Sequence, residues 1–333
     1  MYVEILTGHN MCAIKMPADK AAIIPNCFVI DEVDTKDTEN VICTDTLVSL
    51  AKENDFYVPA KEGTINVKAS YAPSYSAGNA DRIRGGEYLL SGVDCGADIY
   101  NVSWRDMFFD CEDITVEKMY ELTGYRYEGF EPEDFLHSRE IGVNGTVEAH
   151  IMQIRSDMPK ELATVQWQSM KSPVYTTFVP FYTAVMTDTP DSYKIEAAEW
   201  NKDAAFWTYY DLYNIANNNP DTVGVAVKAA WKNYMTIMEK QQKKVNDQML
   251  RIYKNHPENL EYYATELGKQ IAEDTRAYAM TMLAEAQDYV ANSSDNSAPF
   301  VTSVNFKDLS YKTANVQPPK SQKGKENNNG KKK

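Results

Sequence analysis

Apolar and polar residues alternate in the early part of the chain in a way that predicts short β-strands. Over residues 146–155 the alternation is regular, with Val147 and Ile151 on one face and Glu148 and His150 on the other, as expected of a strand with a period of two. Alternation, or enrichment in β-branched and aromatic residues, predicts further strands over residues 1–6, 11–15, 21–24, 163–170 and 173–182. The first part of the chain is therefore expected to be rich in sheet.

From about residue 203 the apolar positions recur with the period of a helix. Trp, Tyr, Met and aliphatic side chains form one stripe over residues 225–254 and another over 260–290, which predicts two long amphipathic helices. Pro257 separates them, so we expect an antiparallel helical hairpin. Such stripes are more typical of a hydrophobic core than of a cofactor site, and we interpret both helices as structural. Shorter helices are predicted over residues 44–53, with Thr44 as the N-cap, 81–90 and 116–122.

The order of these elements, strands first and helices afterwards, indicates an α+β fold. We expect a sheet-containing part over residues 1–200, a helical part over 201–292, and an extended segment with a Lys- and Asn-rich tail over 293–333. From Gln317 onward the chain has too few apolar side chains to form a core, so we expect the tail to be disordered.

Charge narrows the range of partners. The net charge is −14; the tail from Gln317 contributes +5 through six Lys and one Glu, which leaves −19 on residues 1–316. An acidic body repels a phosphate backbone at long range, so nucleic acid is not an expected partner. No apolar run approaches the roughly 20 residues of a membrane-spanning helix, so no membrane partner is expected either. The sequence leaves the compartment open between cytoplasmic and exported.

Cysteine and histidine spacing gives no support for a metal centre. The five cysteines are Cys12, Cys27, Cys43, Cys95 and Cys111. Their odd number and the lack of a C-x-x-C pair fit neither a disulfide framework nor a zinc site, so we interpret them as free, mostly structural thiols. The four histidines show no H-x-x-x-H or H-E-x-x-H spacing, and we expect no metal or other cofactor.

Several segments carry a more specific pattern. They are M-Y-V-E-I-L-T-G-H at 1–9, P-N-C-F-V-I-D-E-V-D at 25–34, N-A-D-R-I-R at 79–84, S-R-E-I-G-V-N-G-T-V-E-A-H-I-M-Q-I-R at 138–155, Trp167, and S-P-V-Y-T-T-F-V-P-F-Y at 172–182. In this order they resemble the dipeptidase A family of cysteine-type N-terminal-nucleophile hydrolases. The resemblance extends from residue 1 to about residue 290, and it implies that residues 1–200 form part of an αββα sandwich.

The resemblance also implies a mechanism. In this family the thiolate of an N-terminal cysteine attacks a peptide carbonyl, its own α-amine acts as general base, and an oxyanion hole stabilises the tetrahedral intermediate. Residues 1 and 2 of this sequence are Met and Tyr, and neither can take the role of that cysteine. We therefore expect the chain to correspond to the larger, C-terminal part of such an enzyme, without the segment that carries the nucleophile and without activity in isolation.

Three residues are candidates for the site that the resemblance implies. Asn26 would donate its amide hydrogen to the oxyanion; the alternative is an Asn that caps the turn after Pro25. Arg82 and Arg84 would lie near the nucleophile or hold a substrate carboxylate by paired hydrogen bonds, the alternative being solvated helix arginines. Gly85 and its neighbour Gly86 suggest a close backbone approach beside them.

Other polar residues are interpreted as structural. Cys27 adjoins Asn26 but has no free amine and no histidine near it in sequence, so we expect a buried structural thiol rather than a replacement nucleophile. A polar group in the longest matching segment is expected to form a buried network that fixes its strand. Its members are Arg139, Glu140, Asn144, Glu148, His150 and Arg155.

The sequence thus predicts a dipeptidase-type peptide hydrolase, present as a fragment or subunit and acting on dipeptides or small peptides. A missing N-terminal half or a second copy of the chain is the expected protein partner. Two alternatives stay open at this stage: a non-catalytic peptide-binding or assembly protein that retains the fold, and a nonfunctional truncation product. Neither a dipeptide preference nor an oligomeric state follows from the sequence.

Overall fold

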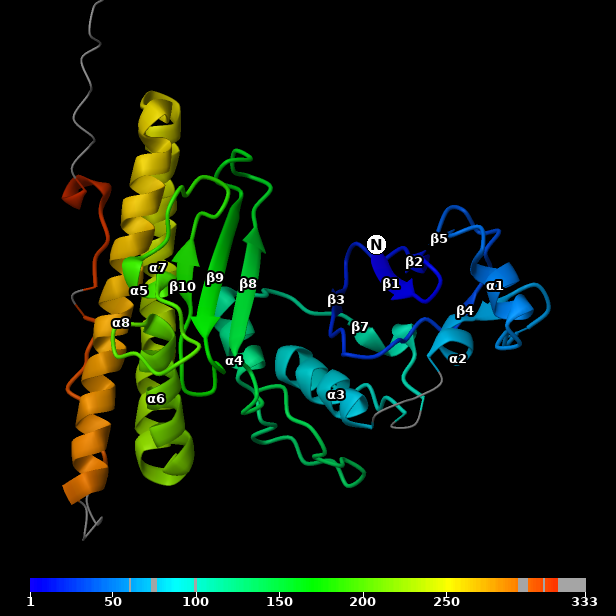
Figure 1. Ribbon diagram of the computed structural model, residues 1–333, viewed down its shortest axis with the longest axis horizontal. Coiled ribbons are helices and arrows are strands. Elements are labelled where there is room, and N and C mark those ends of the chain that lie inside the picture. The colour runs from blue at the N-terminus through cyan, green and yellow to red at the C-terminus, as the bar shows by residue number, and fades with distance from the viewer. Residues whose placement is uncertain (60, 73–76, 99–100, 293–298, 308, 317–333) are drawn as a thin grey trace, which may run out of the picture. The chain divides into compact units, whose positions relative to one another are not determined.

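The computed structural model describes residues 1–59, 61–72, 77–98, 101–292, 299–307 and 309–316 (Figure 1). The chain divides into two compact units, Met1–Asn144 and Gly145–Lys333. Helices and antiparallel sheets occur together, which confirms the α+β class. The tail from Gln317, predicted to be disordered, lies outside the described residues. The division at residue 200 into a sandwich and a helical part stays a prediction.

The first unit is built around a small antiparallel sheet in the order β1-β2-β5 (Figure 1). Its strands are β1 (Tyr2–Leu6), β2 (Asn10–Ile14) and β5 (Val41–Cys43). One face is buried, and Leu6, Cys12 and Ile14 contribute to a core that includes Leu47 and Ala51 of the following helix. The predicted strands at residues 1–6 and 11–15 are therefore confirmed.

Shorter elements complete this unit. Two pairs of two-residue strands join β3 (Ala21–Ala22) to β7 (Phe108–Phe109) and β4 (Glu32–Val33) to β6 (Ile65–Asn66). The helices are α1 (Leu47–Glu53), α2 (Val67–Tyr71), α3 (Gly78–Ser91), η1 (Trp104–Met107) and α4 (Val116–Thr123). The helices predicted at 44–53, 81–90 and 116–122 are all present, the first of them shorter than expected.

Thr44 does not cap the first helix, so that part of the prediction was wrong. Helix α1 begins at Leu47 with Thr46 as the N-cap residue, whose side chain makes no capping hydrogen bond. The Thr44 Oγ1 atom instead accepts the N–H of Met11 at 2.8 Å and donates to the Met11 carbonyl at 3.2 Å. Thr44 therefore ties the end of β5 to β2, because its hydroxyl pairs with strand backbone and not with the helix terminus.

The close backbone approach suggested by the two adjacent glycines is confirmed. A Cβ atom added to Gly85 would lie 2.3 Å from the Tyr127 ring, and one added to Gly86 would lie 3.0 Å from the Ile23 side chain. Helix α3 can therefore contact both segments closely only because these positions lack side chains.

The second unit contains an antiparallel sheet in the order β10-β9-β8. Its strands are β8 (Glu148–Ile154), β9 (Thr164–Met170) and β10 (Val179–Phe181). Burial alternates along β9, where Val165, Trp167 and Ser169 face the interior. The strand predicted over 173–182 is reduced to β10. The residues before β10 form a buried turn and irregular chain, in which Thr176 Oγ1 lies 2.9 Å from both Ser169 Oγ and the Ser172 carbonyl oxygen.

Helices cover one side of this second sheet. The helices of this unit are α5 (Asp191–Lys194), α6 (Ala205–Asn218), the π-helical turn η2 (Pro220–Gly224), α7 (Val225–Asn255), η3 (Pro257–Asn259), α8 (Leu260–Asn292) and η4 (Thr313–Asn315). Of these, α6 contacts β9 and α8 contacts β10. Helices α7 and α8 lie side by side and run in opposite directions, which confirms the helical hairpin (Figure 1). Trp231 and Tyr234 of α7 contact Phe306 from the segment that follows α8, and their side chains are core residues as predicted.

Within the described parts of the chain, no helix is both long enough and apolar enough to span a membrane. The same residues contain no group of three or more His, Cys, Asp or Glu side chains arranged to hold a metal ion.

Candidate active site

Asn26 and Arg82 line the same cavity in the first unit. The cavity has a volume of about 350 Å³, and its other lining residues are Ala22, Ile23, Ile24, Pro25, Leu122, Thr123 and Ile141. Pro25 is buried while the Asn26 side chain is exposed, so the turn is anchored at Pro25 and presents the amide to solvent. Among the described residues, the Asn26 amide makes no hydrogen bond, which leaves its N–H groups available to a ligand.

Arg82 brings a half-buried positive charge to this cavity. Its Nε atom donates to the Glu140 carbonyl oxygen at 3.2 Å, which orients the guanidinium group. No carboxylate of the described residues pairs with it. Burial and the neighbouring charge of Arg139 lower the pKa of Arg82, but an arginine stays protonated at neutral pH. Arg82 can therefore receive a carboxylate from a ligand.

Arg84 belongs to a different environment, although it lies only two residues further along α3. Its buried guanidinium group donates to both carboxylate oxygens of Asp94, at 2.8 and 2.6 Å, and to Asp134 at 2.9 Å. The hydrogen bonds that Arg84 donates to these two aspartates raise its pKa even though burial opposes the shift. Two helix positions two residues apart point about 200° from each other, so the Arg82 side chain lines the cavity and the Arg84 side chain does not.

A buried carboxylate fixes the chain that follows Asn26. Glu4 of β1 is only 3% exposed, and its Oε1 atom accepts the N–H groups of Val29 at 2.6 Å and Ile30 at 3.1 Å. The Tyr2 hydroxyl donates to the same oxygen at 3.2 Å. Burial raises the pKa of Glu4, and the two backbone hydrogen bonds only partly offset that effect. Glu4 therefore attaches the segment that carries Asn26 to the central sheet.

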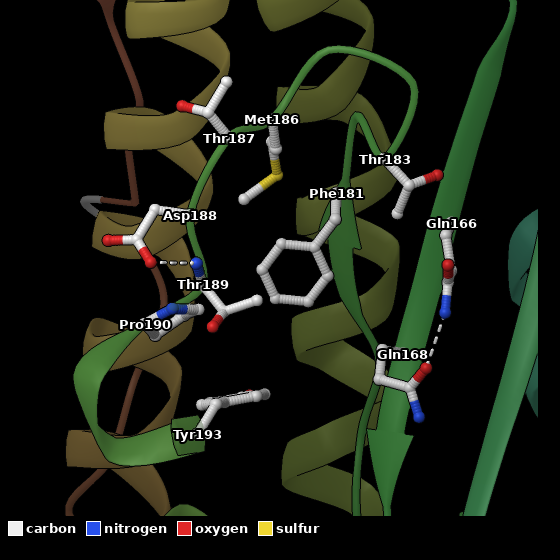
Figure 2. A pocket seen from close by; sticks show the side chains of 10 residues that line it. All are labelled: Gln166, Gln168, Phe181, Thr183, Met186, Thr187, Asp188, Thr189, Pro190 and Tyr193. Carbon is white, nitrogen blue, oxygen red and sulfur yellow. Dashed lines mark hydrogen bonds between the residues drawn. The ribbon is translucent and has the colours of Figure 1, made fainter.

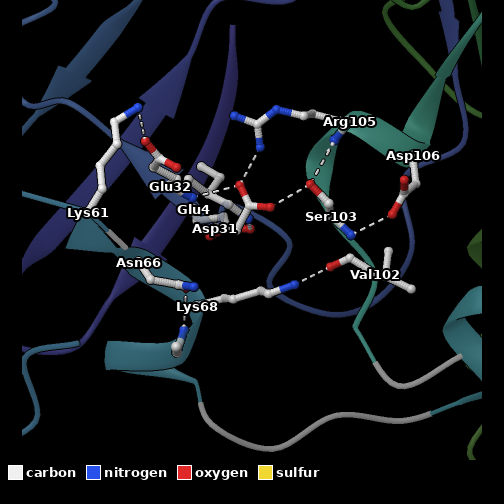
Figure 3. A network of polar contacts seen from close by, with 12 residues as sticks. Glu4, Asp31, Glu32, Lys61, Asn66, Lys68, Val102, Ser103, Arg105 and Asp106 are labelled. Carbon is white, nitrogen blue, oxygen red and sulfur yellow. Dashed lines mark hydrogen bonds and ion pairs between the residues drawn. The ribbon is translucent and has the colours of Figure 1, made fainter. Parts of the chain in front are cut away.

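The same polar region extends to the segments 66–68 and 102–106 (Figure 3). Asp31 accepts hydrogen bonds from Ser103 Oγ and from the Arg105 guanidinium, both at 2.6 Å. Burial alone would raise the pKa of Asp31, but these hydrogen bonds outweigh it and the pKa is lowered. Lys68 donates to the Val102 carbonyl, and burial lowers the pKa of its ammonium group.

Sequence reasoning missed Glu4 and Lys68. A signal for Glu4 was present, because Glu4 shares the core-facing side of β1 with Leu6. A carboxylate on the core-facing side of a strand indicates that it accepts hydrogen bonds from other groups inside the fold. Lys68 carries no comparable signal, because a lysine in a short helix is normally solvated.

Cys27 does not have the properties of a reactive thiol. It is half-buried, and burial together with the nearby negative charge of Glu4 raises its pKa to about 11. A thiol with so high a pKa is almost entirely protonated at neutral pH and is a poor nucleophile. These properties agree with the interpretation of Cys27 as a structural thiol.

The polar residues of segment 138–155 do not form the single buried network that was expected. In the first unit Arg126 donates to Asn144 at 2.7 Å and pairs with Glu140 at 3.3 Å. In the second unit Glu148 pairs with His150 at 3.3 Å, and both side chains are about half exposed. The prediction of one buried network was wrong because the boundary between the two units, after Asn144, falls inside this segment.

A second cavity lies in the other unit (Figure 2). Its volume is about 540 Å³, and its lining residues are Gln166, Gln168, Phe181, Thr183, Met186, Thr187, Asp188, Thr189, Pro190 and Tyr193. The Phe181 ring points into the middle of this lining, and Gln166 donates to Gln168 at 2.7 Å along one wall. Asp188 is already paired with Lys194 and Lys269. None of the candidate residues Asn26, Arg82 and Arg84 lines this cavity, so it gives no support to the site that the sequence predicts.

The chain belongs to peptidase family C69, whose model matches residues 1–81 and 110–233. It is 26% identical over 273 residues to a probable dipeptidase B of Streptococcus pyogenes serotype M1, covering 74% of this chain and 53% of that protein. It is 31% identical over 219 residues to dipeptidase A of Lactobacillus helveticus, covering 62% of this chain and 45% of that protein.

A probable dipeptidase B of Lactococcus lactis is 30% identical over 239 residues, which cover 66% of this chain and 48% of that protein. The chain thus spans about half the length of the curated relatives that it matches. These comparisons confirm the resemblance drawn from the sequence segments.

Proposed function

We propose that this chain provides the oxyanion-stabilising and substrate-binding part of a cysteine-type dipeptidase, whose thiol nucleophile comes from chain outside residues 1–333. The observation that carries the proposal is the shared cavity of Asn26 and Arg82. The cavity combines an amide donor with a guanidinium group that no carboxylate of the described residues pairs with. This combination suits a small substrate that has both a scissile carbonyl and a carboxylate. A dipeptide has both groups.

Each residue has a separate role in this proposal. Asn26 donates an amide hydrogen to the oxygen that becomes negatively charged as the thiolate attacks, and it does so without titrating. Arg82 binds the substrate's terminal carboxylate through paired hydrogen bonds. A cavity of about 350 Å³ is at the small end of the range for ligand sites, which favours a dipeptide over a longer peptide.

The remaining features of the predicted enzyme follow from the same proposal. The sheets of residues 1–200 form part of an αββα sandwich that the nucleophile-bearing chain completes. Without that chain, residues 1–333 bind a dipeptide weakly and do not hydrolyse it. Arg84 acts through its ion pairs with Asp94 and Asp134, which hold α3 in place, and supports the position of Arg82 from within the same helix.

Co-expression with the N-terminal half of the probable dipeptidase B of Streptococcus pyogenes tests the proposal. We expect the pair to hydrolyse dipeptides and to lose that activity on thiol alkylation. Arg82→Gln should raise KM much more than it lowers kcat, because its contact is with a part of the substrate that does not react. Arg251→Gln, at an exposed arginine on α7 in the second unit and outside the cavity lining, serves as the matched control and should leave both constants unchanged. A pair that assembles but hydrolyses no dipeptide would contradict the proposal and favour a non-catalytic peptide-binding protein.

A further inference from the structure

Two of the five cysteines face each other across neighbouring strands. Cys12 of β2 and Cys43 of β5 are direct partners in the antiparallel register, and their Sγ atoms are 3.2 Å apart. Both are free thiols in the structure. Sequence spacing gave no reason to pair them, because 30 residues separate the two positions and only the sheet brings them together.

The geometry of this strand pair suits a covalent bond. The N–H of Thr44 donates to the Met11 carbonyl, and the N–H of Lys15 donates to the Asn40 carbonyl. Because hydrogen-bonded and non-hydrogen-bonded pairs alternate along an antiparallel ladder, the Cys12 and Cys43 pair occupies a non-hydrogen-bonded position. The Cα atoms at such a position are about 4.5 Å apart, which lies within the range that disulfides span.

The two thiols also differ in a way that assigns a role to each. Cys12 is fully buried, whereas Cys43 is partly exposed. The hydrogen bond between them, followed by burial, raises the pKa of Cys12. The same hydrogen bond lowers the pKa of Cys43 even though burial opposes the shift. Cys43 is therefore the accessible thiol that reacts first, and Cys12 is the buried thiol that resolves the product.

We propose that Cys12 and Cys43 form a reversible cross-strand disulfide when the folded protein meets a small-molecule disulfide such as oxidised glutathione. The thiolate of Cys43 attacks one sulfur of the small disulfide and expels the other as a thiolate, which takes up a proton. Cys12 then gives its proton to solvent, and its sulfur attacks Cys43 Sγ and expels the second small thiol. The two protein thiols lose two electrons and two protons, and one small disulfide is reduced to two thiols.

The position of the pair links it to the candidate active site. In the register of the sheet, Glu4 is the partner of Cys12, and Cys12 is the partner of Cys43. One row of side chains thus runs from β5 across β2 to the carboxylate that holds the N–H groups of Val29 and Ile30. A covalent bond between the two cysteines would join β2 to β5, beside the strand β1 whose Glu4 holds the segment that follows Asn26. The modification itself does not depend on the proposed function.

Thiol counting on the folded chain tests the proposal. The protein is incubated with oxidised glutathione, quenched in acid, unfolded, and labelled with an alkylating agent. We expect the number of labelled cysteines to fall from five to three, with an intact mass lower by two hydrogen atoms before labelling. A peptide that joins Cys12 to Cys43 should appear after digestion, and dithiothreitol should restore five labels. Five labels after the treatment, or a bond between any other pair, would overturn the proposal.

Single variants separate the roles of the two thiols. In Cys12→Ser, Cys43 should retain one bound glutathione, because the resolving thiol is gone. In Cys43→Ser, Cys12 should stay unmodified, because the small disulfide does not reach it. Cys95→Ser is the matched control: Cys95 is exposed and lies outside the pair, so Cys12 and Cys43 should still join. Far-ultraviolet circular dichroism on each variant verifies that the fold is intact. Glutathione retained on Cys12 in place of Cys43 would contradict the assigned order.

Discussion

The interiors of the two units of this chain differ in composition. In Gly145–Lys333, helices α7 and α8 of about thirty residues each enclose an aromatic core that includes Trp231 and Phe306. In Met1–Asn144 the strands are two to five residues long, and buried polar groups such as Glu4 and Arg84 take part in the interior. Both units have an apolar core, but the first also buries charged side chains such as Glu4 and Arg84, whose hydrogen bonds hold its segments in place.

The candidate site is found in the unit that contains most of the buried charged side chains, among them Glu4 and Arg84. The Asn26 and Arg82 cavity, the Glu4 carboxylate and the Cys12 and Cys43 pair all belong to Met1–Asn144. Short strands and turns leave many backbone groups outside regular ladders, so side chains must satisfy them. Such an arrangement fixes individual side chains in place, as a binding or catalytic site requires.

The largest expected effect concerns the aromatic core of the second unit. Trp231→Ala should lower the free energy of unfolding by about 3–5 kcal/mol, because it empties a fully buried site. Hydrogen exchange read by mass spectrometry should show lost protection in residues 145–292 and little change in residues 1–144. The control is Trp200→Ala, at a tryptophan that is 62% exposed, where we expect about 0.5 kcal/mol or less. Equal loss of protection in both units would show that they do not unfold separately.

A smaller effect is expected where two segments of the first unit meet. Gly85→Ala would bring a Cβ atom to 2.3 Å from the Tyr127 ring, and overpacking of this kind costs about 1–3 kcal/mol. Gly86→Ala is the matched control, because its Cβ would lie 3.0 Å from the Ile23 side chain, a less severe contact than the one at Gly85. Both variants gain similar helix propensity, so urea unfolding should show Gly85→Ala as the less stable of the two. Equal stabilities would mean that the Tyr127 segment moves aside without cost.

The smallest expected effect is a pH dependence from Glu4. The pKa of Glu4 is raised in the folded state. Its contribution to stability is therefore complete below about pH 4.3, the pKa of Glu in an unfolded chain. That contribution is lost as the pH rises through the folded-state pKa. Glu4→Gln keeps an oxygen that accepts the Val29 and Ile30 N–H groups but cannot ionise. The stability of Glu4→Gln relative to the parent should therefore increase from pH 4 to pH 8 in urea unfolding. A constant difference across that range would contradict a charged, buried Glu4.

The sequence predicted the two long helices better than the short strands and helix caps, for a physical reason. The stripes over 225–254 and 260–290 repeat over many turns, and Pro257 marks the junction, so α7 and α8 follow from pattern alone. The strand predicted over residues 173–182 is present only as β10. Val174 and Tyr175 favour strands, but here they fill a buried turn. The prediction that Thr44 caps a helix was wrong for a similar reason, since a threonine hydroxyl can hydrogen-bond to the backbone of a strand as well as to a helix terminus.

The candidate site was predictable only in part. The matched segments named Asn26, Arg82 and Arg84, but the sequence comparison treated the two arginines alike. Their spacing on a helix already implies opposite directions, and the structure adds the partners that occupy Arg84, namely Asp94 and Asp134. Those partners lie 10 and 50 residues away in the chain, and local sequence patterns do not predict contacts over such separations.

The turnover of Asn26→Ala in the reconstituted enzyme tests the central claim most directly. Loss of one oxyanion donor typically lowers kcat by about a hundred- to a thousand-fold, and we expect a decrease of that order with little change in KM. The matched control is Asn54→Ala, an exposed asparagine at the end of α1, which should keep the parent kcat. If an active pair that carries Asn26→Ala has the same kcat as the parent pair, Asn26 does not stabilise the oxyanion and the account of this cavity is contradicted.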